Sequence, residues 1–278
     1  MTNILNFFDQ ENKSLKRLGL ALSGGGAKGM AHLGILQFFR EENVNFHAVS
    51  GTSIGAIVGA FYCKGYTPLE TLDFFKNTSF FSFDKFSWGS KGLIDSSKFI
   101  DDFKKYFPEN NFSELEKPLV VCATDILEGK EAVFNNGKLI EALLSSAAFP
   151  GMISPMEWND KLYADGGILN NLPASHIRHE CEYVVGIKLQ PIEHMKKSDI
   201  NSTFDLLARV YELNGLSTEL REMDHCDLAL VPKHLLFVST FNVKSEDLER
   251  TFELGYEYAR EYFSAQQKEL DNLKKRSE

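Results

Sequence analysis

The chain has 278 residues, of which 43% are hydrophobic and 25% are charged, and its formal net charge is −9 at pH 7. This composition is typical of a soluble globular protein that is large enough to bury a substantial core. The acidic balance argues against a nucleic-acid-binding protein, whose binding face would be basic, and it disfavours attachment to anionic lipid by charge alone.

The sequence shows no secretion signal and no membrane span. Residues 1–17 lack a basic segment followed by an apolar stretch and a cleavage site, and no run of about 18 apolar residues occurs. The cysteines are widely spaced and form no CxxC pair, so we interpret them as buried thiols in a reducing compartment. They are Cys63, Cys122, Cys181 and Cys226. We therefore expect a cytoplasmic protein without a metal or other cofactor.

Short apolar runs alternate with helical patterns along the chain, which predicts βα units around a mainly parallel sheet. The predicted strands are Leu18–Leu22, Phe46–Val49, Leu119–Thr124, Lys130–Phe134 and Tyr183–Leu189. The predicted helices are Gly29–Glu42, Ile54–Cys63, Lys138–Ala148 and a long amphipathic helix from Ser245 to about Lys275.

The first predicted strand ends in a glycine-rich loop that fits the pattern G-x-G-x-x-G. Its residues are Gly24-Gly25-Gly26-Ala27-Lys28-Gly29. A dinucleotide-binding loop would need an acidic residue at the end of the second strand, where the sequence has none, so we expect no dinucleotide. The backbone N–H groups of such a loop, next to a helix N-terminus, are also suited to form an oxyanion hole, and Gly25 and Gly26 are the favoured donors. Lys28 either adds positive charge at its mouth or is a solvated lysine at the start of a helix.

The second predicted strand leads into a candidate nucleophile elbow, G-x-S-x-G, which places a serine on a sharp turn between a strand and a helix. Its residues are Gly51-Thr52-Ser53-Ile54-Gly55. A serine hydroxyl needs a neighbouring base. None of the histidines has a sequence context that recommends it, whereas Asp165 follows a short strand and precedes Gly166-Gly167. The alternative for Asp165 is an ordinary Asx turn.

Taken together and in this order, these motifs resemble the patatin-like phospholipase family. The resemblance extends to Ala123-Thr124-Asp125, Ser145-Ser146-Ala147-Ala148-Phe149-Pro150-Gly151 and Asn171-Leu172-Pro173. It covers roughly residues 18–189. It implies a three-layer α/β/α sandwich with a mainly parallel central sheet. We expect a catalytic domain of this type at 18–190 and, at 191–278, a mostly helical extension packed on the same domain.

The resemblance also implies a chemistry. Ser53 is expected to be the nucleophile and Asp165 the residue that accepts its proton, with the glycine loop as the oxyanion hole and no metal. The expected substrates are acyl esters of phospholipids or lysophospholipids. The alternatives are a carboxylesterase or thioesterase that acts on soluble acyl esters and a non-catalytic, lipid-binding regulatory protein.

Two segments bear on how lipid would be bound. The stretch from Phe74 to Trp88 is rich in aromatic residues, and Phe80, Phe81 and Phe83 are candidates for a lid or interfacial surface that accepts acyl chains or contacts the membrane transiently. The alternative is core packing of these rings against the sheet. The apolar stripe of the last helix favours packing on the domain over an oligomer or membrane contact.

Overall fold

The computed structural model describes residues 17–78, 80–81, 99–190, 195–197, 200–238, 240 and 243–277. Within these residues, eight strands form one sheet in the order β5-β6-β3-β2-β1-β7-β8, and β4 also pairs with β3. The strands are β1 (Leu18–Leu22), β2 (Ala48–Thr52), β3 (Leu119–Asp125), β4 (Lys130–Phe134), β5 (Met156–Trp158), β6 (Lys161–Asp165), β7 (Tyr183–Ile187) and β8 (Leu228–Leu230). The run from β8 through β3 is parallel, whereas β4 and β6 lie antiparallel to β3.

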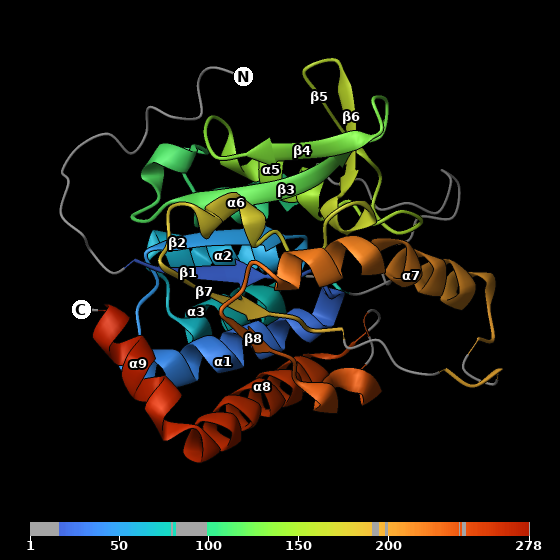
Figure 1. The fold of residues 1–278 in the computed structure, drawn as a ribbon. Coiled ribbons are helices and arrows are strands. Elements are labelled where there is room, and N and C mark those ends of the chain that lie inside the picture. The colour runs from blue at the N-terminus through green and yellow to red at the C-terminus, as the bar shows by residue number, and fades with distance from the viewer. Residues whose placement is uncertain are drawn as a thin grey trace.

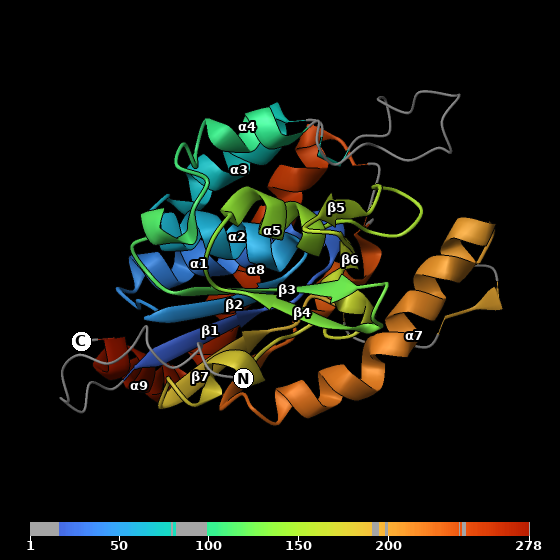
Figure 2. The same cartoon turned by 90° about the horizontal axis from the view of Figure 1, so that it is seen from above.

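Helices cover both faces of this sheet (Figures 1 and 2). One face carries α1 (Met30–Glu41), α2 (Ile54–Lys64), α3 (Pro68–Asn77), α4 (Ile100–Lys104), α5 (Leu139–Ser146) and α8 (Ser245–Ala265). The opposite face carries α6 (Ser175–Arg178) and α7 (Thr203–Met223), and α9 (Gln267–Ser277) follows α8. The predicted three-layer α/β/α sandwich with a mainly parallel sheet is confirmed.

The core lies on both sides of the sheet, which explains why the central strands are apolar along their whole length. All five residues of β1 are buried. The larger hydrophobic cluster includes Phe39, Phe61 and Phe74 from the helices of the first face. A smaller cluster on the other face joins Leu172 and Ile177 to the sheet.

Of the C-terminal helices, α8 packs on α1, and α9 contacts α8 and β1 (Figure 1). At the crossing of α1 and α8, a side chain at Gly34 would clash with the backbone of Phe252, and one at Gly255 would clash with the backbone of Ala31. The two glycines therefore set how closely the helices approach.

The prediction of one long terminal helix is wrong in one respect, because Gln266 leaves helical geometry at ψ 47° and separates α8 from α9. The domain boundary expected at residue 190 stays a prediction. It does not divide the sheet, because β8, from the later part of the chain, pairs with β7.

The predicted second strand is also shifted. Its apolar residues suggested Phe46–Val49, but β2 runs from Ala48 to Thr52 because its extent is set by parallel pairing with β1 and β3. Phe46 precedes the strand and lies in the core. None of the helices in the described part of the chain is long and apolar enough to cross a bilayer.

Candidate active site

Ser53 occupies a strained turn between β2 and α2. Its backbone has φ 54° and ψ −124°, a conformation that a residue with a side chain rarely adopts. Hydrogen bonds on both sides hold the turn. The Thr52 hydroxyl donates to the Asn170 carbonyl at 2.8 Å, and the Ser53 N–H donates to Ser146 Oγ at 2.7 Å. Because α2 begins at Ile54, the positive end of its dipole lies beside the serine.

The register of β3 explains how Ser53 meets Asp165. Thr52, the last residue of β2, pairs with Cys122, and Asp165, the last residue of β6, pairs with the next residue, Ala123. Strand β4 occupies one edge of β3. Strands β2 and β6 therefore both pair with the other edge of β3, where they meet end to end. Ser53 and Asp165 line the same cavity, and the Ser53 side chain is close enough to the Asp165 carboxylate to lower its pKa.

The Asp165 carboxylate is buried, with 1% of the residue exposed. Oδ1 accepts hydrogen bonds from the Gly167 N–H at 2.8 Å and from the Tyr211 hydroxyl at 2.7 Å. Burial raises the pKa of Asp165 above its ordinary value, and the bonds from Ser53, Gly167 and Tyr211 offset part of that rise.

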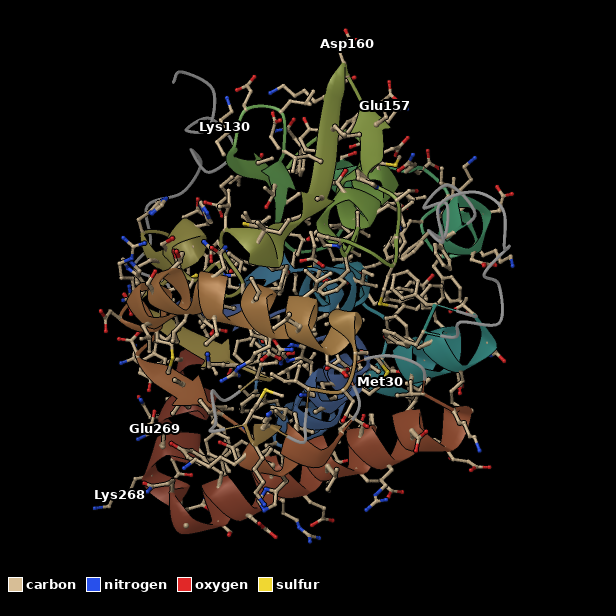
Figure 3. The ribbon with its side chains drawn as sticks, turned by 90° about the vertical axis from the view of Figure 1, so that its right-hand side faces the viewer. Met30, Lys130, Glu157, Asp160, Lys268 and Glu269 are labelled. Carbon is tan, nitrogen blue, oxygen red and sulfur yellow. The ribbon has the colours of Figure 1, made fainter. Side chains whose placement is uncertain are left out.

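Tyr211 is a site residue that sequence reasoning missed. It comes from α7, which crosses in front of the strand ends, between the β5–β6 hairpin, whose tip is Asp160, and α8 (Figure 3). Its ring packs on Phe149 with 4.8 Å between ring centroids. Gly167 makes room for it, since a side chain there would clash with the Tyr211 hydroxyl. No local motif marks Tyr211, so only the tertiary structure identifies it.

Ser146 is a second residue without a predicted role. Its hydroxyl accepts the Ser53 N–H and donates to the Cys122 carbonyl at 2.5 Å, so it ties the turn to β3. Its only signal in the sequence was its place in the Ser-Ser-Ala-Ala segment.

The glycine loop lies beside the serine, and its N–H groups are not equivalent. The Gly24 N–H donates to the Asn171 carbonyl at 3.1 Å, and the Ala27 N–H donates to the Thr240 carbonyl at 2.9 Å. For Gly25 and Gly26, no backbone acceptor occurs among the described residues, and both line the same cavity as Ser53. These two N–H groups are therefore the candidates for binding an oxyanion. Gly29 ends the short 3-10 helix η1 (Gly26–Gly29).

Lys28 is not a solvated lysine. The residue is 8% exposed, and burial lowers the pKa of its ammonium group while the nearby Glu212 carboxylate opposes that shift. It is not among the residues that line the cavity around Ser53.

None of the described histidines lines that cavity. His32 is buried, and its Nε2 donates to the Ser23 carbonyl at 2.9 Å; burial lowers its pKa to about 4, so the ring is neutral. His176 contacts Glu131. The other described histidines are exposed, and they are His47, His179, His225 and His234. His194 lies outside the described residues.

A cavity of about 350 Å³ opens at the serine. Its polar floor contains Ser53 and Asp165, and its walls are largely apolar. The apolar side chains on the walls include Phe80, Phe81, Phe149, Met152 and Ile153. Phe80 and Phe81 are 7% and 5% exposed, so they are part of the cavity wall and core rather than an exposed lipid-binding surface. Phe83 lies outside the described residues.

One group of side chains has the donor types of a metal site. Potential ligand atoms of Cys122, Glu131 and His176 lie within 4.8 Å of one another. The polar atoms of these side chains are already paired with one another. The Cys122 thiol and His176 both hydrogen-bond to the Glu131 carboxylate, which also accepts a hydrogen bond from Asn170 at 3.1 Å. We interpret the group as a hydrogen-bond network that braces β3 and the segment that follows Asp165.

Comparison with known proteins decides the family. Residues 20–177 match the profile of the patatin-like phospholipases. The chain belongs to this family. The predicted resemblance is confirmed, and the patatin-like match spans the glycine loop, the elbow and the Asp165 segment.

The relatives are longer proteins. An uncharacterized NTE family protein of Mycobacterium tuberculosis is 35% identical over 167 residues, which cover 59% of this patatin-like chain and 46% of the relative. Lysophospholipase NTE1 of Candida glabrata is 28% identical over 167 residues, or 58% of this chain and 10% of the relative. The chain thus spans less than half the length of these curated relatives. The crystal structure of VipD from Legionella pneumophila superposes with a TM-score of 0.55 at 15% identity, covering 90% of this chain and 67% of VipD, which supports the fold alone.

Proposed function

We propose that this patatin-like chain is a serine hydrolase that cleaves the acyl ester bonds of phospholipids or lysophospholipids. The observation that carries the proposal is that Ser53 and a buried Asp165 lie together in one cavity with largely apolar walls. A serine that lines a cavity on a strained elbow, with a carboxylate beside it, is the arrangement that an acyl-transfer reaction requires.

The proposed reaction has two halves. Ser53 Oγ attacks the ester carbonyl carbon while its proton passes to the Asp165 carboxylate, and the carbonyl oxygen becomes an oxyanion. The intermediate collapses, the C–O bond to the leaving alkoxide breaks, and Asp165 returns the proton to that alkoxide. Water then attacks the acyl-serine with Asp165 again as base, which releases a carboxylic acid and restores Ser53.

An ordinary aspartate is a weak base toward a hydroxyl group. Burial addresses this weakness, because the raised pKa makes Asp165 a better proton acceptor than a solvated carboxylate. At the other end of the reaction, we assign the N–H groups of Gly25 and Gly26 as the donors that stabilise the oxyanion. Each such donor typically contributes about 3 kcal/mol to transition-state stabilisation.

The substrate class is argued from the walls of the cavity. Phenylalanine, methionine and isoleucine side chains favour an acyl chain, and the cavity volume lies within the range of small-molecule sites. The relative named Lysophospholipase NTE1 supports a lipid ester. We further propose that the protein works in the cytoplasm and contacts the membrane surface transiently, because such substrates reside in bilayers.

The test compares Ser53→Ala with wild type on lysophosphatidylcholine in micelles and on a short p-nitrophenyl ester. We expect Ser53→Ala to lower turnover of both by about 10³-fold or more, and to abolish labelling by a fluorophosphonate probe. Ser113→Ala, at an exposed serine, serves as the control. Undiminished turnover in Ser53→Ala contradicts the proposal. Turnover of the soluble ester alone by wild type would instead favour a carboxylesterase.

A further inference from the structure

Helix α7 presents an apolar face to solvent. Its exposed positions, among those whose side chains are described, are Leu206, Leu207, Val210, Leu213, Asn214, Ser217, Leu220 and Arg221. The leucines and the valine are each 49–59% exposed. At 100° per residue, Leu206, Val210, Leu213 and Leu220 fall within one stripe. Although the chain has a net charge of −9, no carboxylate occurs among these exposed positions.

The opposite face of α7 is polar and turned inward. The Tyr211 hydroxyl bonds to Asp165, and the buried Glu219 pairs with the Lys188 ammonium and accepts from Asn171. One turn further along, the buried Glu222 accepts from Asn170 and from Ser175. These bonds fix which face of the helix points outward.

Helix α7 has no buried apolar stripe of the usual kind, because its apolar residues are spread around the helix and several of them face solvent. A surface helix ordinarily buries its apolar stripe and exposes its charges, because apolar surface left in water is unfavourable. The inward bonds of Tyr211, Glu219 and Glu222 prevent α7 from rotating to bury its leucines. An exposed apolar stripe held in place in this way marks a surface that meets an apolar partner.

The position of the helix identifies the partner. Asp205, Ala208, Tyr211 and Glu212 of α7 line the cavity that contains Ser53, so the apolar stripe lies on the other side of the cavity wall. The N-terminal half of α7 also projects beyond the rest of the fold (Figure 2). A bilayer seated on this stripe would therefore be separated from the cavity that contains Ser53 by the width of one helix.

We propose that the outward face of α7, formed by Leu206, Leu207, Val210, Leu213 and Leu220, inserts into the surface of a lipid bilayer and seats the cavity against it. This inference rests on the proposed lipid hydrolase function, because that function identifies the partner of the α7 face as a lipid bilayer. The only charged side chain among the described exposed positions of the face is Arg221, so insertion brings no carboxylate toward lipid phosphates. The helix lies in the interface and does not span the bilayer.

The test measures flotation with phosphatidylcholine vesicles and uses the Ser53→Ala protein throughout, so that binding is read without turnover. The α7 variant carries Leu206→Ser, Val210→Ser and Leu213→Ser. The matched control carries Leu69→Ser, Leu127→Ser and Val133→Ser, at side chains that are 42–66% exposed elsewhere on the surface. We expect the α7 variant to bind vesicles on the order of a hundredfold more weakly than the parent, and the control to bind like the parent.

The same triple substitutions in the active protein give a second readout. The ratio of vesicle hydrolysis to soluble-ester hydrolysis should fall by a similar factor in the α7 variant and stay at the wild-type value in the control. Equal flotation of the α7 variant and the parent overturns the proposal. So does a parent dimer in sedimentation that the α7 substitutions dissociate, because the stripe would then be a subunit interface. Absence of ester turnover in wild type refutes the proposed function but leaves the flotation result interpretable.

Discussion

At the scale of single residues, the proposed chemistry depends on the surroundings of one carboxylate. Asp165 is buried, yet its Oδ1 accepts two hydrogen bonds and its carboxylate a third interaction, from Ser53. Burial raises the pKa and the donors lower it, so the balance between them sets how good a base Asp165 is. Tyr211 is the donor that a substitution can remove most cleanly.

We predict that Tyr211→Phe shifts the acidic limb of the pH profile of kcat/KM to higher pH. The base must be deprotonated, so activity falls as the pH drops through the pKa of Asp165. Because the pKa of Asp165 is raised, we expect that limb in wild type to lie above the pH of an ordinary aspartate. Loss of the Tyr211 hydroxyl removes a bond that favours the carboxylate, so the pKa rises further. We also expect kcat/KM at its optimum to fall roughly tenfold.

The matched control is Tyr256→Phe. Its hydroxyl also donates to a carboxylate, Glu41, at 2.7 Å, but on the surface between α8 and α1. It should leave the pH profile unchanged. An acidic limb in Tyr211→Phe at the wild-type position would show that the tyrosine does not tune the base.

At the scale of elements, the contact of α1 with α8 depends on glycine. Gly34 and Gly255 allow the two backbones to touch, and Phe38 stacks on Phe263 beside them with ring centroids 5.6 Å apart. Helix α8 is thereby part of the main hydrophobic core.

We predict that Gly255→Ala lowers the free energy of unfolding by about 1–3 kcal/mol, because the added methyl group must displace the backbone of α1. The sign is informative, since alanine at an unhindered position inside a helix would stabilise the protein by about 1 kcal/mol instead. Denaturant unfolding measures the effect. Glu253→Ala, at an exposed position of the same helix, is the control. A stabilised Gly255→Ala protein would refute the close contact.

At the scale of the whole molecule, the active site is expected to cost stability. A carboxyl group whose folded pKa is raised stabilises the fold only below its ordinary pKa, and that contribution is lost as the pH rises through the folded value. At pH values above its raised pKa, Asp165 is therefore a buried charge that the fold tolerates. The conformation of Ser53, with its positive φ, adds strain at the same place.

We predict that Asp165→Asn is more stable than wild type at neutral pH, although its ester turnover falls by orders of magnitude. The amide keeps Oδ1 as an acceptor for Gly167 and Tyr211 but carries no charge to desolvate. Thermal unfolding across a pH series should show a higher Tm for the variant near pH 7. The difference should shrink as the pH falls toward the ordinary pKa of aspartate. A variant that is less stable than wild type at neutral pH would contradict this account of the site.

The sequence alone determined the elements whose signals are local. The apolar run Leu18–Leu22, the serine motif around Ser53 and the Asp-Gly-Gly segment at Asp165 each carry their information within a few neighbouring residues. Through the resemblance to the patatin-like family that they carry, these segments predicted the α/β/α fold and nominated Ser53 and Asp165. That the two side chains meet depended on the register of β3, where Cys122 and Ala123 pair with the ends of β2 and β6.

Only the tertiary structure revealed α7 and its role. A periodic pattern predicts that the apolar stripe of a helix faces inward, but in α7 the buried positions are Gly215, Glu219 and Glu222, while the leucines face solvent. The partners that make this orientation favourable are Asp165, Lys188 and Asn170, which are distant in sequence. Hydrogen bonds between distant residues leave no local pattern, so the orientation of α7 and the place of Tyr211 could be read only from the folded chain.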